Sequence, residues 1–289
     1  MKTLLITMAT LLVYAVGAQT HSDKIVRELA FEKSNENNTL ILANINGSMK
    51  VEGYNGTKVL IEVTRVLTAK TDAGLEKAKQ EVVVEQIDRA DTLIVYVNDG
   101  CNHFSYDTKF RKHKGWAYSG HHDAGCDMLY DYKTEFIVKV PYAIHLNVST
   151  INAGDISVEN VSGMVVANNI NGSIKLKDLK SATKATTING NVDLEYAGNP
   201  TKDCRYYTLN GNINAWFQKG LAANLSFKSF NGELFSNVAQ LESLPVSLQR
   251  EANGKIKLNG SQYKISKGGA LLDFETFNGD VYLREKNEN

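Results

Sequence analysis

The stretch Ile-Asn-Gly-Ser-Ile-Lys-Leu at residues 170–176 recurs as Ile-Asn-Gly-Asn-Val-Asp-Leu at residues 188–194, eighteen positions later. In both copies the second and fourth positions after the glycine are apolar, and the positions beside them are polar. Apolar residues at every second position predict a half-buried β-strand. The preceding Asn-Gly predicts a tight turn, because both residues accept left-handed backbone angles. Each copy therefore reads as one turn that leads into one strand.

The same pattern surrounds eight glycines, seven of which follow an asparagine: Gly47, Gly154, Gly172, Gly190, Gly211, Gly232, Gly254 and Gly279. From Gly154 onward they are spaced by 18, 18, 21, 21, 22 and 25 residues. A near-constant spacing of one unit predicts stacked, equivalent coils. We therefore expect an all-β fold, a parallel β-solenoid of short coils with Asn-Gly corners. Asparagine amides stacked at these corners are expected to hydrogen-bond from coil to coil.

A string of antiparallel hairpins, folded as a sandwich or barrel, is the alternative, because Asn-Gly is also a strong hairpin signal. Hairpin turns usually recur every eight to twelve residues or so. The spacing here is about twice that, which favours coils that each hold two strands.

Composition excludes several classes of protein. The 289 residues carry 32 Lys+Arg and 32 Asp+Glu, so the formal net charge is zero. A general nucleic-acid binder needs a basic surface to displace counterions, and a polybasic membrane-surface protein needs one as well. With 43% hydrophobic and 22% charged residues, the chain has an ordinary globular balance.

The first 18 residues predict a signal peptide. A basic start is followed by an apolar run from Leu4 to Val16 and by small residues before a cut after Ala18. A retained membrane anchor is the alternative, but the run is shorter than the roughly 20 residues that a span needs. We expect residues 19–289 to form one domain in the periplasm, on the outer surface or outside a bacterial cell.

An insertion at about residues 64–141 separates the first repeat from the others. Thr71 to Gln80 predicts a short helix with Thr71 or Asp72 as its N-cap. Strands are expected around Val82–Val84 and Leu93–Val97, and at residues 136–140 before Pro141. These strands should pair beside or across the first coils, while residues 20–37 and 284–289 are candidate caps or tails.

These features together resemble the bacterial putative-adhesin family of β-solenoid envelope proteins. The resemblance rests on the Asn-x-Asn-Gly start at residues 44–47, the Val-Glu-Gly-Tyr-Asn-Gly step at 51–56, the helix with its strand pair, and the serial Ile-Asn-Gly units. It covers roughly residues 38 to 284. That family is related to auto-transporter adhesin-head domains with a Gly-Ile-Asn-type motif. The resemblance implies an exported bacterial protein with a non-catalytic surface or scaffold role, and it supplies no catalytic residues.

One segment, residues 101–127, is dense in cysteine and histidine and is expected to be a loop. In an oxidising compartment the first expectation is a Cys101–Cys126 disulfide. A zinc or copper site is the sharper alternative, because thiolates and imidazoles are ligands of both metals. Its candidate ligands are Cys101, His103, His121, His122 and Cys126. Solvated histidines in a loop are the third possibility. Cys204 lies in another coil and is expected to be a buried free thiol.

The repeat does not favour a catalytic function, because its aligned positions lack a pair of acidic residues. A glycosidase needs two carboxyl groups about 5 to 9.5 Å apart. When the repeats are aligned on their turn glycines, the residues that directly follow the glycine form one column across the coils. From Gly154 onward this column contains Asp155, Ser173, Asn191, Asn212, Glu233, Lys255 and Asp280. In chain order, no two consecutive coils carry an acidic residue at this position. A carbohydrate-active β-helix enzyme nevertheless stays open as an alternative, as does a metal-binding protein.

Aromatic residues at outward-facing strand positions, which align from coil to coil in columns, are the candidate binding surface. Phe235 and Tyr282 occupy one such column, and Trp216 flanks it. Aromatic faces can stack on sugars or anchor protein partners. The alternative is that most of these rings cover neighbouring coils. Together with the resemblance to the putative-adhesin family, these observations imply an adhesin-like or envelope scaffold that needs no cofactor. It presents a rigid face to a cell-surface polymer or protein, with no nucleic-acid partner and no membrane span after signal removal.

Overall fold

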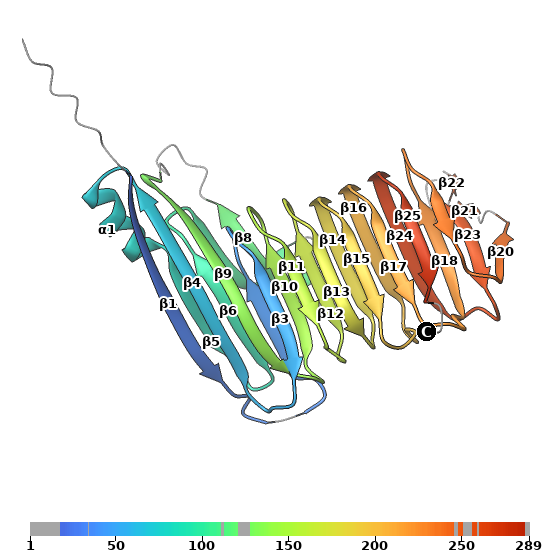
Figure 1. The fold of residues 1–289 in the computed structure, drawn as a ribbon, viewed down its shortest axis with the longest axis horizontal. Coiled ribbons are helices and arrows are strands. Elements are labelled where there is room, and N and C mark those ends of the chain that lie inside the picture. The colour runs from blue at the N-terminus through green and yellow to red at the C-terminus, as the bar shows by residue number, and fades with distance from the viewer. Residues whose placement is uncertain are drawn as a thin grey trace, which may run out of the picture.

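The computed structural model of the protein describes residues 18–33, 35–110, 113–120, 128–245, 248–250, 256–258 and 260–286. The described chain is all-β apart from one helix, α1 (Asp72–Glu81), and most strands belong to two large mixed sheets. Figure 1 shows these sheets as two long rows of strands. The predicted signal peptide lies outside the described residues except for Ala18, and export therefore stays a prediction.

The ten-stranded sheet is called sheet A. In spatial order its strands are β1 (Gln19–Leu29), β4 (Val59–Ala69), β9 (Tyr130–Pro141), β3 (Met49–Tyr54), β11 (Ile156–Glu159), β13 (Ile174–Leu179), β15 (Val192–Tyr196), β17 (Ile213–Phe217), β25 (Val281–Glu285) and β19 (Leu234–Ser236). The pairs β1–β4 and β4–β9 are antiparallel, and every later pair is parallel.

The eleven-stranded sheet is called sheet B. In spatial order its strands are β20 (Leu241–Leu244), β23 (Ser261–Ile265), β18 (Ala223–Lys228), β24 (Ala270–Asn278), β16 (Cys204–Asn210), β14 (Thr183–Asn189), β12 (Val165–Asn169), β10 (His145–Thr150), β2 (Thr39–Ala43), β6 (Thr92–Asn98) and β5 (Val83–Asp88). Its pairs are parallel from β18 to β6 and antiparallel at both ends.

From β10 to β17 the chain alternates between the two sheets. A strand of sheet B, a corner and the next strand of sheet A form one coil. Each coil pairs in parallel with the coil before it, which puts Ile156 beside Ile174, Ile174 beside Val192 and Val192 beside Ile213. The repeat spacing in the sequence therefore corresponds to two strands per coil, as predicted. We call the coils from β10 to β17 the serial stack.

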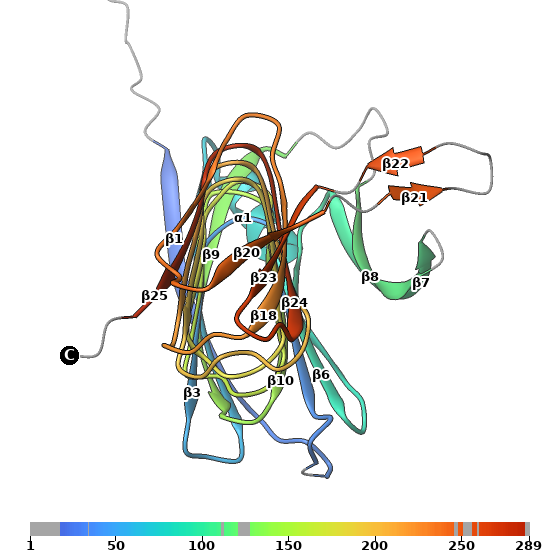
Figure 2. The same cartoon turned by 90° about the vertical axis from the view of Figure 1, so that its right-hand side faces the viewer.

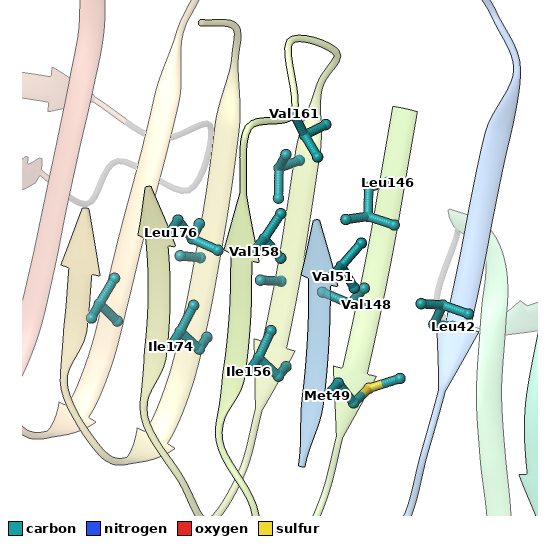
Figure 3. Close-up of a cluster of buried hydrophobic side chains, with 14 of the residues drawn as sticks. Leu42, Met49, Val51, Leu146, Val148, Ile156, Val158, Val161, Ile174 and Leu176 are labelled. Atoms are coloured by element: carbon teal, nitrogen blue, oxygen red, sulfur yellow. The ribbon is translucent and has the colours of Figure 1, made fainter. Parts of the chain in front are cut away.

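The hydrophobic core lies between the two sheets, because every second side chain of each strand points inward. Ile156 and Val158 from sheet A and Leu146 and Val148 from sheet B are at most 1% exposed. Figure 3 shows these side chains between the two layers of strands. In the end view of Figure 2 the strands of successive coils overlie one another around this core.

The corners carry the predicted asparagine ladder. Each amide donates from Nδ2 to Oδ1 of the neighbouring coil at 2.8 or 2.9 Å, and the chain of bonds joins Asn152, Asn171, Asn189, Asn210, Asn278 and Asn231. Inside the corner, Thr187 and Thr208 donate to the carbonyl oxygens of Gly172 and Gly190 at 2.8 Å. Polar side chains thus satisfy the backbone where the chain leaves each sheet.

Outside residues 101–127, the inserted segment contains the helix and the strands that the sequence predicts. Thr71 caps α1 by accepting a hydrogen bond from Gly74 N at 3.1 Å. Strands β5 and β6 form an antiparallel pair, and β6 and β9 then pair in parallel with β2 and β3. The first residues expected as a cap or tail form β1, a full-length edge strand against β4.

The C-terminal coils are not stacked in chain order, which corrects the sequence prediction. Strand β24 lies between β16 and β18, and β25 lies between β17 and β19, so the last coil sits between two earlier ones. Burial explains the order, since Val281 and Leu283 on β25 are fully buried, whereas on β19 Leu234 is only half-buried and Ser236 is exposed. We call the coils built from β18, β19, β24 and β25 the interleaved coils. Gly254 lies outside the described residues.

The segment expected as a cysteine- and histidine-rich loop contains a hairpin instead, formed by β7 (Asn102–Phe110) and β8 (His113–Gly120). Phe104 stacks on Tyr96 of sheet B with ring centroids 4.3 Å apart. Tyr118 donates to the carbonyl oxygens of Val97 and Ala43 at 2.8 and 3.0 Å. A small second core on the outer face of sheet B therefore holds this hairpin.

A second hairpin, β21 (Leu248–Arg250) with β22 (Ile256–Leu258), lies on the same side of the molecule in Figure 2. Over the central and C-terminal part of sheet A, no described element covers the outer face, as the same view shows. No described helix is long and apolar enough to cross a membrane.

Candidate functional site: an aromatic patch on sheet A

Four side chains on the outer face of sheet A form what we call the aromatic patch: Trp216, Phe235, Tyr282 and Arg284. They come from three neighbouring strands, since β25 carries Tyr282 and Arg284 and lies between β17 with Trp216 and β19 with Phe235. Strand pairing places Trp216 beside Arg284 and Tyr282 beside Phe235. The patch therefore exists because the last coil is inserted between two others.

Strand alternation turns these side chains outward. Ala215 and Leu283, their chain neighbours, are fully buried in the core between the sheets. Successive side chains on a strand point to opposite faces, so Trp216, Tyr282 and Arg284 must face away from that core. The rings are thus carried by hydrogen-bonded strands and not by loops.

The rings and the guanidinium are in direct contact. Phe235 and Tyr282 are stacked, with ring centroids 5.1 Å apart and planes inclined by 14°. The Arg284 Cζ atom lies over two rings, 4.7 Å from the Tyr282 centroid and 5.1 Å from the Trp216 centroid. Phe235 is 44% exposed, so its outer face is open to solvent. The result is a continuous aromatic surface with one cation set into it.

Polar groups border the patch on both sides. Tyr282 donates from its hydroxyl to Asp280 Oδ2 at 3.2 Å. Burial raises the pKa of the Tyr282 phenol, and the hydrogen bond to Asp280 raises it further. Tyr282 therefore stays a neutral donor at physiological pH. A hollow beside Trp216 is lined by Lys175, Asp193, Glu195 and Lys286.

This arrangement is suited to binding. Aromatic faces on a rigid sheet can stack on the apolar faces of sugar rings or receive a protein side chain, while the bordering polar groups fix the orientation of the ligand. The three aromatic residues predicted as a binding surface are thus brought together.

Sequence reasoning missed Arg284, although its position two residues after Tyr282 on a strand places both on one face. It also missed an exposed apolar column at the corners, formed by the residue before each ladder asparagine. Ile170, Ile188, Phe277 and Phe230 belong to this column, and the rings of the last two are stacked with centroids 4.8 Å apart. The sequence signal was the apolar residue that precedes Asn-Gly.

The predicted cysteine and histidine site is mostly outside the described residues. His121, His122 and Cys126 lie there, so neither the Cys101–Cys126 disulfide nor the metal site is tested. His103 is exposed on β7, and Cys101 is half-buried at the start of the hairpin, where its backbone N–H donates to Asp99 Oδ1 at 2.8 Å. The residues that the structure describes contain no group of three or more His, Cys, Asp or Glu placed to hold a metal ion.

Cys204 is a buried free thiol, as predicted. Its sulfur lies 3.4 Å from the Tyr196 hydroxyl and 3.4 Å from the carbonyl oxygen of Lys202. Tyr206 accepts or donates a 2.6 Å hydrogen bond with Tyr196 in the same cluster. These buried contacts give the thiol a structural place in the core.

The coil order corrects one argument against catalysis. Chain order separated Asp280 from Glu233, but the insertion of β25 makes their coils neighbours. Asp280 Oδ1 accepts a hydrogen bond from Glu233 N at 3.0 Å, and its other oxygen accepts one from Tyr282. Two acids therefore do occupy consecutive coils in this column, so chain order does not exclude a carboxylate pair.

Comparisons with known proteins leave the family unassigned. No family model and no curated protein matches the chain. Among solved structures, a putative cell adhesion protein from Clostridium sporogenes has 12% identity and a TM-score of 0.43, covering 92% of this chain and 100% of its own. A putative adhesin from Bacteroides fragilis has 8% identity and a TM-score of 0.38, covering 91% and 97%. A putative lipid binding protein from Parabacteroides distasonis has 11% identity and a TM-score of 0.27, covering 92% and 97%. Similarities of this size do not assign the chain to a family.

Proposed function

We propose that the protein is an exported, adhesin-like β-solenoid of the bacterial envelope that binds a surface polysaccharide without cleaving it. The aromatic patch is its binding site, with Trp216, Tyr282 and Phe235 as the stacking residues. The predicted signal peptide supports export, and the parallel, two-strand coils support the solenoid.

The observation that carries the proposal is the stacked Phe235–Tyr282 pair next to Trp216 on a face that no described element covers. Sugar rings present apolar C–H faces, and a row of aromatic rings can stack on successive residues of a polymer. Strands hold the rings in place before the ligand arrives, so little side-chain entropy is lost on binding. A flat, open surface suits a long chain better than a small, enclosed substrate.

Sedimentation with a panel of insoluble polysaccharides tests this proposal. We expect the wild-type protein to bind at least one of them, and Trp216→Ala and Phe235→Ala each to weaken binding by about tenfold or more. Phe230→Ala is the matched control, because Phe230 is a 73% exposed aromatic residue at the same end of the molecule but outside the patch. Thermal melting of each variant checks that the fold is kept.

Three results would contradict the proposal. The first is equal binding by wild type and both patch variants, which would place the ligand elsewhere. The second is no binding to any polysaccharide together with binding to a protein that depends on Trp216. The third is release of new reducing ends from the bound polymer, since that would make the protein an enzyme and would direct attention to Asp280 and Glu233.

A further inference from the structure

The cation in the aromatic patch is held between aromatic rings. Arg284 lies over the faces of both Tyr282 and Trp216, at 4.7 and 5.1 Å from the two centroids. Contacts between a guanidinium and aromatic faces restrain its position, and the N–H donors lie in the plane of the group. The rings thus hold the cation without using its hydrogen-bond donors.

Carboxylates that border the patch have partners of their own. Asp193 accepts from Asn214 Nδ2 at 2.8 Å, and Glu195 pairs with Lys286 at 2.7 Å. Asp280 receives Glu233 N and the Tyr282 hydroxyl. Within the described part of the chain, the side chain of Arg284 contacts the rings of Tyr282 and Trp216 and has neither an ion pair nor a hydrogen bond.

Other arginines of the protein behave differently. Arg65 pairs with Asp23, and Arg205 donates to Glu275 Oε2 at 3.1 Å. Arg27 donates to Gln86 and to the carbonyl oxygen of Val84, at 2.9 and 2.6 Å. Each of these side chains joins one strand to another, whereas Arg284 leaves its donors toward solvent within a surface suited to sugars.

We infer that the ligand of the aromatic patch is an acidic polysaccharide whose uronic-acid carboxylates are bound by Arg284. This inference rests on the proposed function and specifies its substrate class. The planar guanidinium matches the two oxygens of a carboxylate and can donate two parallel hydrogen bonds to it. The neighbouring rings meanwhile stack on the sugar faces, so one uronate residue engages both parts of the patch.

Two forms of one polymer test the inference, namely polygalacturonate and the same polymer with its carboxyl groups methyl-esterified. The backbone is shared, and only the charge differs. We expect wild-type protein to bind polygalacturonate about tenfold or more tightly than the ester, as one charge-assisted pair allows. Arg284→Gln should lower polygalacturonate binding to the level of the ester and leave binding to the ester unchanged.

Two further variants separate the recognition of a carboxylate from general attraction by charge. Arg284→Lys keeps the charge but loses the planar fork, so we expect most of the preference to disappear. Lys50→Gln removes a cation from the exposed outer face of β3, which lies outside the patch on the same sheet, and should change the preference by less than about twofold, because a surface charge acts weakly through solvent. Dextran sulfate serves as the sulfate-bearing probe, and we expect weaker binding to it than to polygalacturonate.

The possible failures are distinguishable. Equal binding of both polymer forms, or binding of neutral polysaccharides only, with loss in Trp216→Ala, would overturn the inference while the proposed function stands. A preference for dextran sulfate, or one that survives in Arg284→Gln, would also overturn it. No binding to any polysaccharide would overturn both.

Discussion

The serial stack and the interleaved coils use the same corner chemistry but differ in the order of the chain. From β10 to β17 each coil follows its neighbour in sequence, whereas β24 and β25 lie between coils that precede them. The asparagine ladder nevertheless continues through both regions, from Asn210 to Asn278 and on to Asn231, at 2.9 Å each. The corner thus specifies that coils stack and leaves their order to the side chains between the sheets.

The interleaved coils also show how a surface arises from such an order. Tyr282 contacts Phe235 on one side, and Arg284 contacts Trp216 on the other, only because β25 has a neighbour on each edge. In a stack of strict chain order, Trp216 and Phe235 would belong to adjacent coils, and Tyr282 would lie beyond them.

Truncating a core side chain should lower the free energy of unfolding equally in both regions, and by less at the end of the stack. Leu194 in the serial stack and Leu283 in the interleaved coils are both fully buried, whereas Leu234 on the edge strand β19 is half-buried. We expect Leu194→Ala and Leu283→Ala each to lower the free energy of unfolding by about 2–5 kcal/mol, and Leu234→Ala by about 1 kcal/mol. Urea denaturation with the m-value checked gives these numbers. A loss for Leu283→Ala as small as that for Leu234→Ala would mean that β25 is an outer strand.

Replacing a corner asparagine should lower the free energy of unfolding in proportion to the number of ladder hydrogen bonds that its amide makes. Asn210 donates to Asn189 and accepts from Asn278, so its replacement by alanine removes two hydrogen bonds. Asn231 at the end of the ladder makes only the bond to Asn278. We expect losses of about 1–2 kcal/mol for Asn210→Ala and about half of that for Asn231→Ala. Equal losses from thermal or urea unfolding would show that the ladder does not act through its amide bonds.

The smallest effect belongs to the opposite end of the molecule, where Asp23 on β1 pairs with Arg65 on β4. The hydrogen bond and charge of Arg65 lower the pKa of the Asp23 carboxyl, against a smaller opposing effect of burial. Because the folded pKa is the lower one, the pair stabilises the fold above the unfolded pKa of about 3.9, and this contribution is lost as the pH falls through the folded pKa.

Asp23→Asn should therefore destabilise the protein by less than about 1 kcal/mol at pH 7, since solvent screens a partly exposed pair. At a pH below the folded pKa of Asp23, wild type and variant should unfold at the same denaturant concentration. A difference that persists unchanged at acid pH would show that the charge of Asp23 is not what stabilises β1.

Local chemistry made much of the fold predictable. Thr71 predicted the start of α1, and the Asn-Gly turns followed by alternating apolar residues predicted the coils. The order of the interleaved coils was harder to predict because every corner carries the same signal. Ser236 was the available clue, as a polar residue at an inward position is tolerated at the end of a stack and not within it.

Contacts between distant segments account for what the sequence did not reveal. The hairpin β7–β8 is held by Phe104 on Tyr96 and by Tyr118 on two backbone carbonyls, and neither contact has a local signature. The aromatic residues of the patch were predictable as outward-facing side chains. The contact of Arg284 with these rings depends on the order of the strands in sheet A. The same order makes Asp280 the neighbour of Glu233.

Paired cysteines test the central claim, that the last coil is inserted and thereby builds the patch. Arg205 on β16 and Ser226 on β18 each face Asp273 on β24 in register. Registered neighbouring strands lie about 4.8 Å apart, within reach of a disulfide, and strands two apart lie about 9.6 Å apart, which is too far. We predict that Arg205→Cys with Asp273→Cys forms an intramolecular disulfide on oxidation, detected by peptide mapping, and that Arg205→Cys with Ser226→Cys does not. The reverse result would show that the coils stack in chain order and that Tyr282 does not lie between Trp216 and Phe235.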